Sequence, residues 1–173
     1  MRKRNYFQTQ LNWFTAEEHS SVLFRMLNDL FFPDPLPDAD IVFGPLGPGT
    51  PVRYAVNGEF RPRGIGNGRP AILLDPESIR ASCISAGDSE VFRNLCTCLL
   101  HEMVHYKCWS ENRREVDRTG QYHTKVYQRV AREHGLECEL SPYRPTVDGF
   151  NMTTLSEESW RTILDHLEAY KNT

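Results

Sequence analysis

The sequence predicts a single α+β domain, and three observations lead to this prediction. Residues 17–31 have helical periodicity, residues 40–75 hold short apolar segments separated by turn residues, and helical periodicity returns for most of the chain after residue 88. Helices that are separated from strands along a chain, instead of alternating with them, are typical of α+β folds. The length of 173 residues suits one domain spanning 1–173.

The N-terminal helix is predicted over residues 17–31. Its apolar residues recur at spacings of three and four: Val22, Leu23, Met26, Leu27 and Leu30. Thr15 is the expected N-cap. The proline-rich run 33–38 ends the helix, because proline lacks the backbone N–H and clashes with the preceding turn.

A small antiparallel sheet is predicted over residues 40–75. Its expected strands are 41–43, 53–56, 59–61 and 71–74. Asn57-Gly58 is a dipeptide typical of hairpin turns, and it would join the second strand to the third. Asn67-Gly68 precedes the last strand, and Asp75-Pro76 follows it. We therefore expect an antiparallel meander.

The rest of the chain is predicted to be mainly helical, at 89–110, 122–134 and 156–170. Asp88 or Ser89 caps the first of these helices, Gly135 stops the second, and Ser156 caps the third. Residues 141–154 contain two prolines and are expected to form a loop. The core of the domain is therefore expected at about 15–140, with a C-terminal loop and helix at 141–173.

Composition excludes some classes of protein. The 20 Lys and Arg against 23 Asp and Glu, a net charge of −3, exclude a uniformly basic nucleic-acid binder. The five cysteines form no CxxC pair, so neither a disulfide framework nor a zinc ribbon is expected. The N-terminus has no apolar stretch of a secretory signal, and no run approaches the ~18 apolar residues of a membrane span. A cytoplasmic or nuclear protein with no membrane partner is expected.

One motif, His101-Glu102-Met103-Val104-His105, predicts a metal site in the helix 89–110. Two histidines four residues apart project from one helix face, about one turn from each other, which is the reach that two imidazoles need to bind one Zn²⁺. Glu102 can reach a water at such a site without binding the metal, so its expected role is general base. The alternative is a buried helix with two hydrogen-bonded histidines. It is disfavoured because ionisable groups without partners are costly to bury.

A catalytic zinc site takes three protein ligands and keeps one position open. The metzincin pattern HExxHxxGxxH is excluded, because Cys108 and Glu111 stand where it needs Gly and His. Six downstream side chains are candidates for the third ligand: His123, His134, His166, Glu115, Asp117 and Glu133.

His123 is the expected third ligand. It follows a predicted turn at 119–122, and the loop after the first helix lets the chain double back. His134 lies about 16 Å further along the same helix, so both cannot bind one ion, and a structural or helix-capping role is expected for it. An acid, Glu115 or Asp117, is the remaining alternative.

The stretch LLHEMVHYKCW and the later HTKVYQRVAREHGL together resemble the core of the SprT-like zinc metalloproteases, which include bacterial SprT and eukaryotic Spartan. In that family the third histidine opens a helix that usually starts His-Gly-x-x-Phe. Here Thr124 replaces the glycine, and Tyr127 keeps the aromatic ring. The similarity covers about 95–136. It implies a zincin-like fold, one catalytic Zn²⁺ and peptide-bond hydrolysis in protein substrates, with catalytic Glu102 and the ligands His101, His105 and His123.

The resemblance also raises the possibility of DNA as a partner, because Spartan-type members degrade proteins crosslinked to DNA. This chain shows no cysteine-rich zinc ribbon of the kind that many bacterial members carry. Arginine suits phosphate contact, and two local segments supply the candidates: Arg53, Arg61, Arg63, Arg69, Arg113 and Arg114. The alternative for these segments is an ordinary solvated surface.

Two further functions remain open at this point. One is a non-catalytic SprT-like module that recruits DNA or a protein partner and holds a structural zinc, although such a site has no need of Glu102. The other is a zinc hydrolase for small amides or nucleotides, which requires a deep closed pocket. For a peptidase, an edge strand of the sheet is expected to hold the substrate backbone by strand addition. Candidate donors to the oxyanion are Tyr106, Tyr122, Tyr127 and Tyr143, and Cys98 and Cys108 are expected to line the site.

Overall fold

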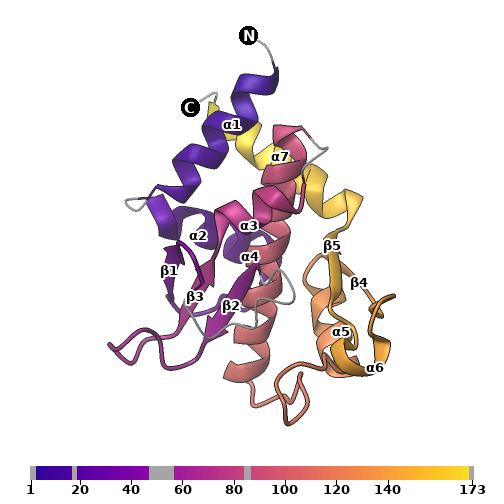
Figure 1. Ribbon diagram of the computed structural model, residues 1–173. Helices are drawn as coiled ribbons and strands as arrows, with labels where there is room; N and C mark the ends of the chain where they lie inside the picture. Colours follow the sequence, from indigo (N-terminus) through magenta and orange to yellow (C-terminus); the bar gives the residue numbers. More distant parts are fainter. Residues whose placement is uncertain (1–2, 17–18, 47–56, 84–86, 172–173) are drawn as a thin grey trace.

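The computed structural model describes residues 3–16, 19–46, 57–83 and 87–171. Figure 1 shows helices gathered above and around a short sheet, with one long helix running through the middle. The elements in chain order are α1 (Lys3–Thr15), α2 (Ser20–Phe31), β1 (Asp40–Phe43), β2 (Gly58–Arg61), β3 (Ala71–Leu74), α3 (Pro76–Ala81), α4 (Asp88–Ser110), α5 (Lys125–Glu133), β4 (Leu136–Glu139), α6 (Pro145–Asp148), β5 (Met152–Leu155) and α7 (Glu157–Lys171).

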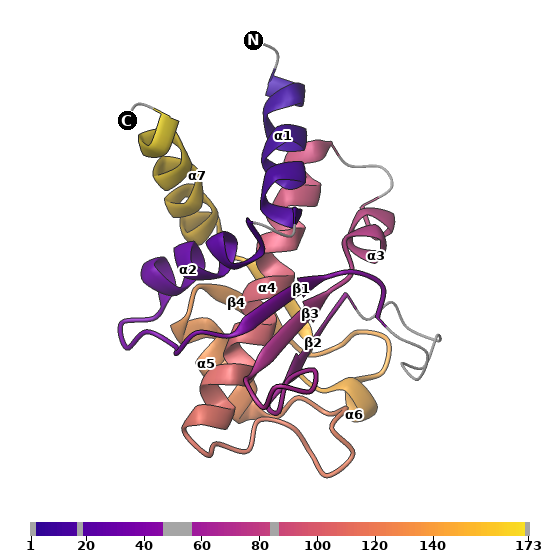
Figure 2. The ribbon, with the colours of Figure 1, turned by 90° about the vertical axis from the view of Figure 1, so that its left-hand side faces the viewer.

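The helix α4 is the centre of the fold. It packs against the sheet β1–β3–β2 on one side and against α5, β4 and β5 on the other (Figures 1 and 2). The apolar stripe that the sequence predicts for it is buried, at Phe92, Leu95, Leu99, Met103 and Tyr106. These side chains belong to a cluster of buried apolar residues that reaches from Leu11 to Leu167. The motif helix is therefore held by packing on both sides.

The N-terminal part contains two helices, where the sequence analysis expected one. Thr15 is the last residue of α1 and not the N-cap of the next helix, and its Oγ1 donates to the Leu11 carbonyl at 2.8 Å. The helix α1 has a weak amphipathic pattern of its own, and its aromatic side chains pack on α4. The rings of Phe14 and Phe92, for example, stack with centroids 5.7 Å apart. Tertiary packing supplies the stability that its own periodicity does not.

The three-stranded sheet is mixed, so the prediction of an antiparallel meander is wrong. The strand order is β1–β3–β2; β1 runs parallel to β3, and β2 runs antiparallel to it. The strand β3 is buried at all four residues. The most apolar strand thus takes the central place, where strands cover both of its edges. The predicted strand 53–56 lies outside the described residues.

Asn57-Gly58 does not form a hairpin turn. Gly58 is the first residue of β2 and pairs with Leu74 of β3. Residues 62–70 connect β2 to β3 instead and contain Asn67-Gly68, whose glycine has φ +78°. Gly58 is needed for another reason, since a Cβ there would lie 3.0 Å from Cγ of Glu102. The glycine permits close approach of the strand to α4.

The helix α5 begins at Lys125, three residues later than predicted. Thr124 is its N-cap, because its side chain accepts from the Val126 N–H at 3.2 Å. His123 therefore precedes the helix instead of opening it. The predicted stop is confirmed, since Gly135 follows the helix end with φ +86°, a conformation that glycine adopts without strain.

Residues 141–154 are not simply a loop. They contain α6 and most of β5, and β5 pairs antiparallel with β4, with Leu136 opposite Leu155. The backbone N–H of Leu155 donates to Oγ1 of Thr97 on α4 at 3.3 Å. The segment after residue 140 is therefore built into the centre of the fold. The last helix, α7, agrees with the prediction, and Ser156 accepts from the Ser159 N–H at 3.0 Å as its cap.

Within the described residues, no helix has both the length and the apolar character needed to cross a bilayer.

Candidate metal centre

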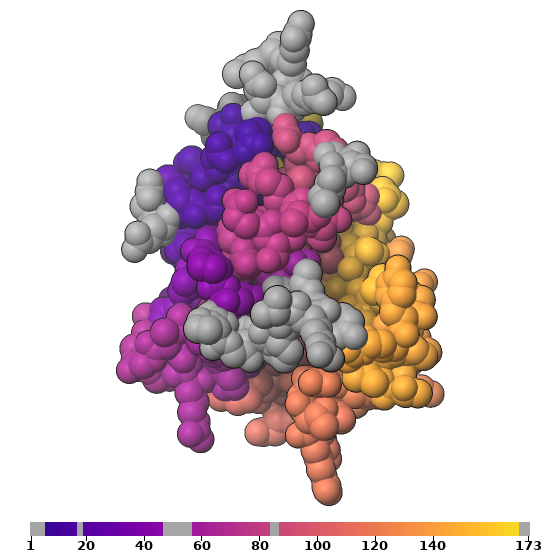
Figure 3. All heavy atoms as spheres, in the orientation of Figure 1, coloured from indigo at the N-terminus to yellow at the C-terminus, as the bar shows by residue number. Residues whose placement is uncertain are grey.

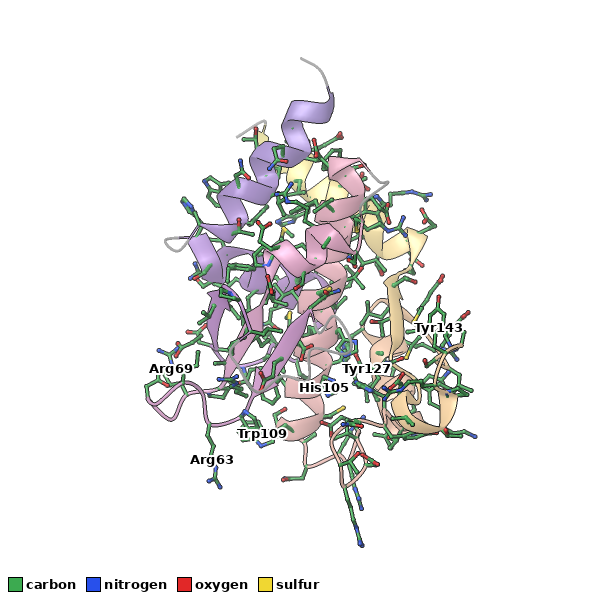
Figure 4. The ribbon with its side chains drawn as sticks, in the orientation of Figure 1. Arg63, Arg69, His105, Trp109, Tyr127 and Tyr143 are labelled. Atoms are coloured by element: carbon green, nitrogen blue, oxygen red, sulfur yellow. The ribbon has the colours of Figure 1, made fainter. Side chains whose placement is uncertain are left out.

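Three histidines converge between α4 and the segment that precedes α5. His101 and His105 lie one turn apart on α4, and His123 approaches them from the other side. One ligand atom from each lies within 4.8 Å of the others. The Nε2 atoms of His105 and His123 are 3.1 Å apart. All three residues are partly exposed, so the cluster can be reached from solvent. Figure 4 places His105 between the sheet side and the α5 side of the molecule.

The Nδ1 atom of each ring points at an oxygen. His101 Nδ1 lies 2.9 Å from Thr153 Oγ1, His105 Nδ1 lies 3.4 Å from a Glu115 carboxylate oxygen, and His123 Nδ1 lies 3.2 Å from the Gln121 carbonyl oxygen.

The Glu115 carboxylate fixes the position of the imidazole proton on His105, and the Gln121 carbonyl fixes it on His123. A backbone carbonyl and an ionised carboxylate only accept hydrogen bonds, so His123 and His105 must carry their proton on Nδ1. Burial acts to raise the pKa of Glu115, but the hydrogen bond with His105, a backbone hydrogen bond and the charges of His105 and His123 together lower it, and the net shift is downward, so the carboxylate is ionised at neutral pH. The Nε2 atoms are then lone-pair donors without hydrogen.

These donors fit a metal ion. Two Nε2 lone pairs facing each other at 3.1 Å repel unless a cation lies between them. Two nitrogens bound to one zinc at ~2.0–2.1 Å in tetrahedral geometry lie about 3.3–3.4 Å apart, close to this spacing. Burial lowers the pKa of His123 to about 4, with His105 contributing, and burial also lowers the pKa of His101 well below its usual 6.5. Both rings are therefore neutral, as metal ligands must be.

The backbone holds His123 from two sides. His123 bridges to Val116 on one side and to Gly149 on the other. Its N–H donates to the Asp148 carbonyl at 3.1 Å, and its carbonyl accepts from the Phe150 N–H at 3.0 Å. Gly149 has φ +61°, and a Cβ there would overlap the His123 carbonyl. His123 is thus positioned by the segment around α6, which lies far from it in sequence.

Tyr127 forms the wall behind the three rings. Its ring centroid lies 4.9, 4.8 and 4.6 Å from those of His101, His105 and His123. Its hydroxyl donates to the His101 carbonyl at 3.3 Å. Tyr127 is fully buried, and burial raises its pKa well above 10, so it stays protonated. Its role is packing and not donation to a substrate oxyanion.

Glu102 is buried beside the histidines, with 7% of its surface exposed. It lies under β2, where the Phe60 N–H donates to its carboxylate. Burial raises its pKa to about 7, against the opposing effects of His105 and of the Phe60 hydrogen bond. The motif therefore places a carboxylate next to the metal-ligand cluster and at the edge of the sheet.

The other candidate ligands have separate roles. His134 Nδ1 contacts the Phe31 carbonyl at 2.8 Å, and its ring stacks on Phe32 at 4.2 Å, which confirms a structural role. Asp117 accepts from the Thr119 hydroxyl and organises the turn before His123. Glu115 contacts His105 from outside the cluster.

The remaining tyrosines and cysteines contribute little to the centre. Tyr106 is buried and stacks on Phe60 with centroids 5.1 Å apart. Tyr143 is 85% exposed and lies on the far side of α5 in Figure 4. Burial raises the pKa of Cys98 to about 12, with Glu102 adding to it, and burial does the same for Cys108. Both cysteines are therefore thiols at neutral pH, and neither belongs to the histidine cluster found among the described residues.

The candidate arginines do not form a continuous unpaired surface. Arg53 lies outside the described residues, and Arg63 is exposed on the β2–β3 connection (Figure 4), as is Arg114 on the α4–α5 connection. Figure 3 shows these two connections projecting from the same end of the molecule. Three others have acidic partners: Arg61 with Glu59 at 2.9 Å, Arg69 with Asp40 at 3.7 Å and Arg113 with Glu111 at 2.9 Å. These pairs reduce the positive charge available to phosphate.

No family model, no curated protein and no solved structure matches this chain. What the chain shows directly is an α+β fold with a histidine cluster that can hold a metal ion.

Proposed function

We propose that this chain is a zinc-dependent metallopeptidase of the SprT-like type, which hydrolyses peptide bonds of protein substrates. One observation carries the proposal: three imidazoles, each offering one ligand nitrogen, converge next to the buried carboxylate of Glu102. Three ligands leave a tetrahedral ion one open position, which is typical of catalytic zinc, whereas structural sites are closed by four ligands. A structural site would also have no use for Glu102.

The chemistry divides between the ion and the chain. Zinc held by His101, His105 and His123 would polarise a scissile carbonyl and promote ionisation of a water. Glu102 takes a proton from the attacking water and returns it to the leaving amine. The Phe60 N–H orients the Glu102 carboxylate, and Tyr127 closes the wall behind the ligands.

The strand β2 is the proposed substrate-binding edge. Among the described residues it is an outer strand of the sheet. Its four residues are half-buried, and it packs against α4 where Glu102 lies. An extended peptide that adds to this side of the sheet would pass the histidines. Action on DNA-associated proteins is a narrower form of the proposal, supported by the SprT-like motif and the two projecting connections that carry Arg63 and Arg114.

The test is cleavage of an unfolded protein by the zinc-loaded wild type, with Glu102→Gln as the inactive variant. We expect Glu102→Gln to keep full zinc content and to lose about 10²–10⁴-fold in rate, because it lacks the base. Glu111→Gln is the matched control, since Glu111 is exposed just beyond the end of the same helix. Parallel reactions use a DNA-bound protein with and without single-stranded DNA.

Equal cleavage by wild type and Glu102→Gln would overturn the assignment of the base. Zinc binding without any cleavage, together with equal partner binding by both proteins, would instead indicate a non-catalytic module.

A further inference from the structure

The outer hydrogen bonds of the metal ligands come from different parts of the chain. His123 uses a carbonyl two residues away, so its partner is local. His101 and His105 use the side chains of Thr153 and Glu115, which lie on β5 and on the α4–α5 connection. Two side chains that the motif does not contain therefore contact the outer nitrogens of His101 and His105.

Thr153 is held rigidly in this position. It lies on β5 and pairs with Cys138 of β4. Leu155, two residues further along β5, is fixed to α4, since its N–H donates to Thr97 Oγ1 at 3.3 Å and its carbonyl accepts from Arg93 at 2.9 Å. Side chains alternate along a strand, so Thr153 points at His101 while Thr154 is exposed. The two adjacent threonines differ only in the face they occupy.

Glu115 is placed by the backbone beside it. Its carbonyl accepts from the Thr124 N–H at 2.8 Å, which ties it to the start of α5. Its side chain is 15% exposed and meets His105, whose side chain is 13% exposed. A carboxylate that accepts from the outer nitrogen of a metal-binding histidine orients the ring and increases its basicity.

We propose that Thr153 and Glu115 are positioning residues, which hold the proton of His101 and His105 on Nδ1 and keep Nε2 directed at the metal. The proposal rests on the metal site of the proposed function. Without its oxygen partner, each ring loses its orientation and the preference for one tautomer. The segment after residue 140 would then be required for metal binding, although it contains no ligand.

The experiment measures zinc affinity by competition with a chromophoric chelator, together with the visible spectrum of the Co²⁺-loaded protein. The variants are Thr153→Val, which keeps the shape and removes the hydroxyl, and Glu115→Gln. We expect each to weaken zinc binding by about 10–100-fold and to alter the Co²⁺ spectrum. Thr153→Ser keeps the hydroxyl that Thr153→Val removes, so we expect it to keep the zinc affinity of the wild type.

Matched controls separate positioning from general destabilisation. Thr154→Val and Glu111→Gln change neighbouring residues of the same types and are expected to leave affinity within about twofold, as side chains outside the contacts do. Urea unfolding of the metal-free proteins should give the same midpoint for Thr153→Val and Thr154→Val. If Thr153→Val does not fold, Glu115→Gln and Thr153→Ser still decide the question.

The outcomes distinguish this proposal from the proposed function. Wild-type affinity and an unchanged Co²⁺ spectrum in both Thr153→Val and Glu115→Gln would overturn the positioning roles and leave the peptidase intact. A zinc-binding wild type that cleaves no protein would overturn the peptidase and leave the positioning roles intact. A wild type that binds no zinc would overturn both.

Discussion

Two regions build the candidate centre, and they do so in different ways. The α4 region, residues 88–110, supplies His101, Glu102 and His105 from one continuous helix. The C-terminal region, residues 115–155, supplies His123 and the outer partners of the ligands from several short segments. Helix geometry sets the spacing of the first group, whereas the position of His123 depends on tertiary contacts.

Because of this difference, substitutions in the two regions should affect different properties of the centre. A helix fixes the spacing of side chains four residues apart through its own hydrogen bonds. His123, by contrast, depends on bridges to Val116 and Gly149 and on residues that flank them. Changes in the C-terminal region should therefore affect metal binding, and changes near Glu102 should affect catalysis while the metal stays bound.

The largest effect is expected from Gly149→Ala. A Cβ at this position, with φ +61°, overlaps the His123 carbonyl, so His123 has to move. We expect a loss of roughly 1–3 kcal/mol in unfolding free energy and a clear loss of zinc affinity. Gly120→Ala is the control, because Gly120 has φ +74° but nothing within 4 Å of its Cβ position. Equal zinc affinity in the two variants would contradict the role of this bridge.

A smaller effect, on rate and not on zinc content, is expected from Gly58→Ala. The added Cβ would lie 2.8 Å from Leu74 Cδ2 and 3.0 Å from Glu102 Cγ, so the carboxylate is displaced. We expect cleavage to slow by roughly tenfold to a hundredfold, because a small misplacement of a catalytic group is costly. Gly44→Ala meets nothing within 4 Å and should be silent. Zinc loss in Gly58→Ala would break the division between the two regions.

The smallest effect concerns His134, a histidine of the C-terminal region that binds no metal. Burial lowers its pKa below 6.5, despite the hydrogen bond to Phe31, and Lys107, Glu133 and Glu111 are the charged groups that act on it. The unfolded chain therefore takes up a proton first as the pH falls through about 6.5, and the folded state loses stability there. Urea unfolding at pH 7 and pH 5 measures this effect. Between the two pH values, His134→Gln should lose less unfolding free energy than the wild type. An identical pH dependence would contradict the assignment.

The two regions also differ in how far sequence predicts them. The helix around His101 and His105, its buried stripe and the choice of His123 follow from periodicity and ligand spacing, since these depend on residues near one another in the chain. Thr153 gave no comparable signal, because a threonine in a segment with two prolines is unremarkable until β5 pairs with β4. The alternation in Leu136–Glu139, buried at Leu136 and Cys138, was a signal for β4 that could have been found.

The sheet shows a similar limit. Apolar character marks the strands at 41–43 and 71–74, but not whether they run parallel, since that depends on which strand fills the central place. The prediction of a hairpin turn at Asn57-Gly58 is wrong for a related reason. A glycine needed for close approach to Glu102 has the same sequence signature, Asn-Gly, as one needed for a turn.

Zinc content reports directly on whether the two regions form one metal site. Wild type, His123→Ala and His166→Ala, a histidine on α7 outside the cluster, are purified with zinc and analysed by mass spectrometry. We predict one zinc per chain in wild type and in His166→Ala, and none retained in His123→Ala, because two imidazoles alone hold zinc weakly. One zinc per chain in His123→Ala would contradict the account.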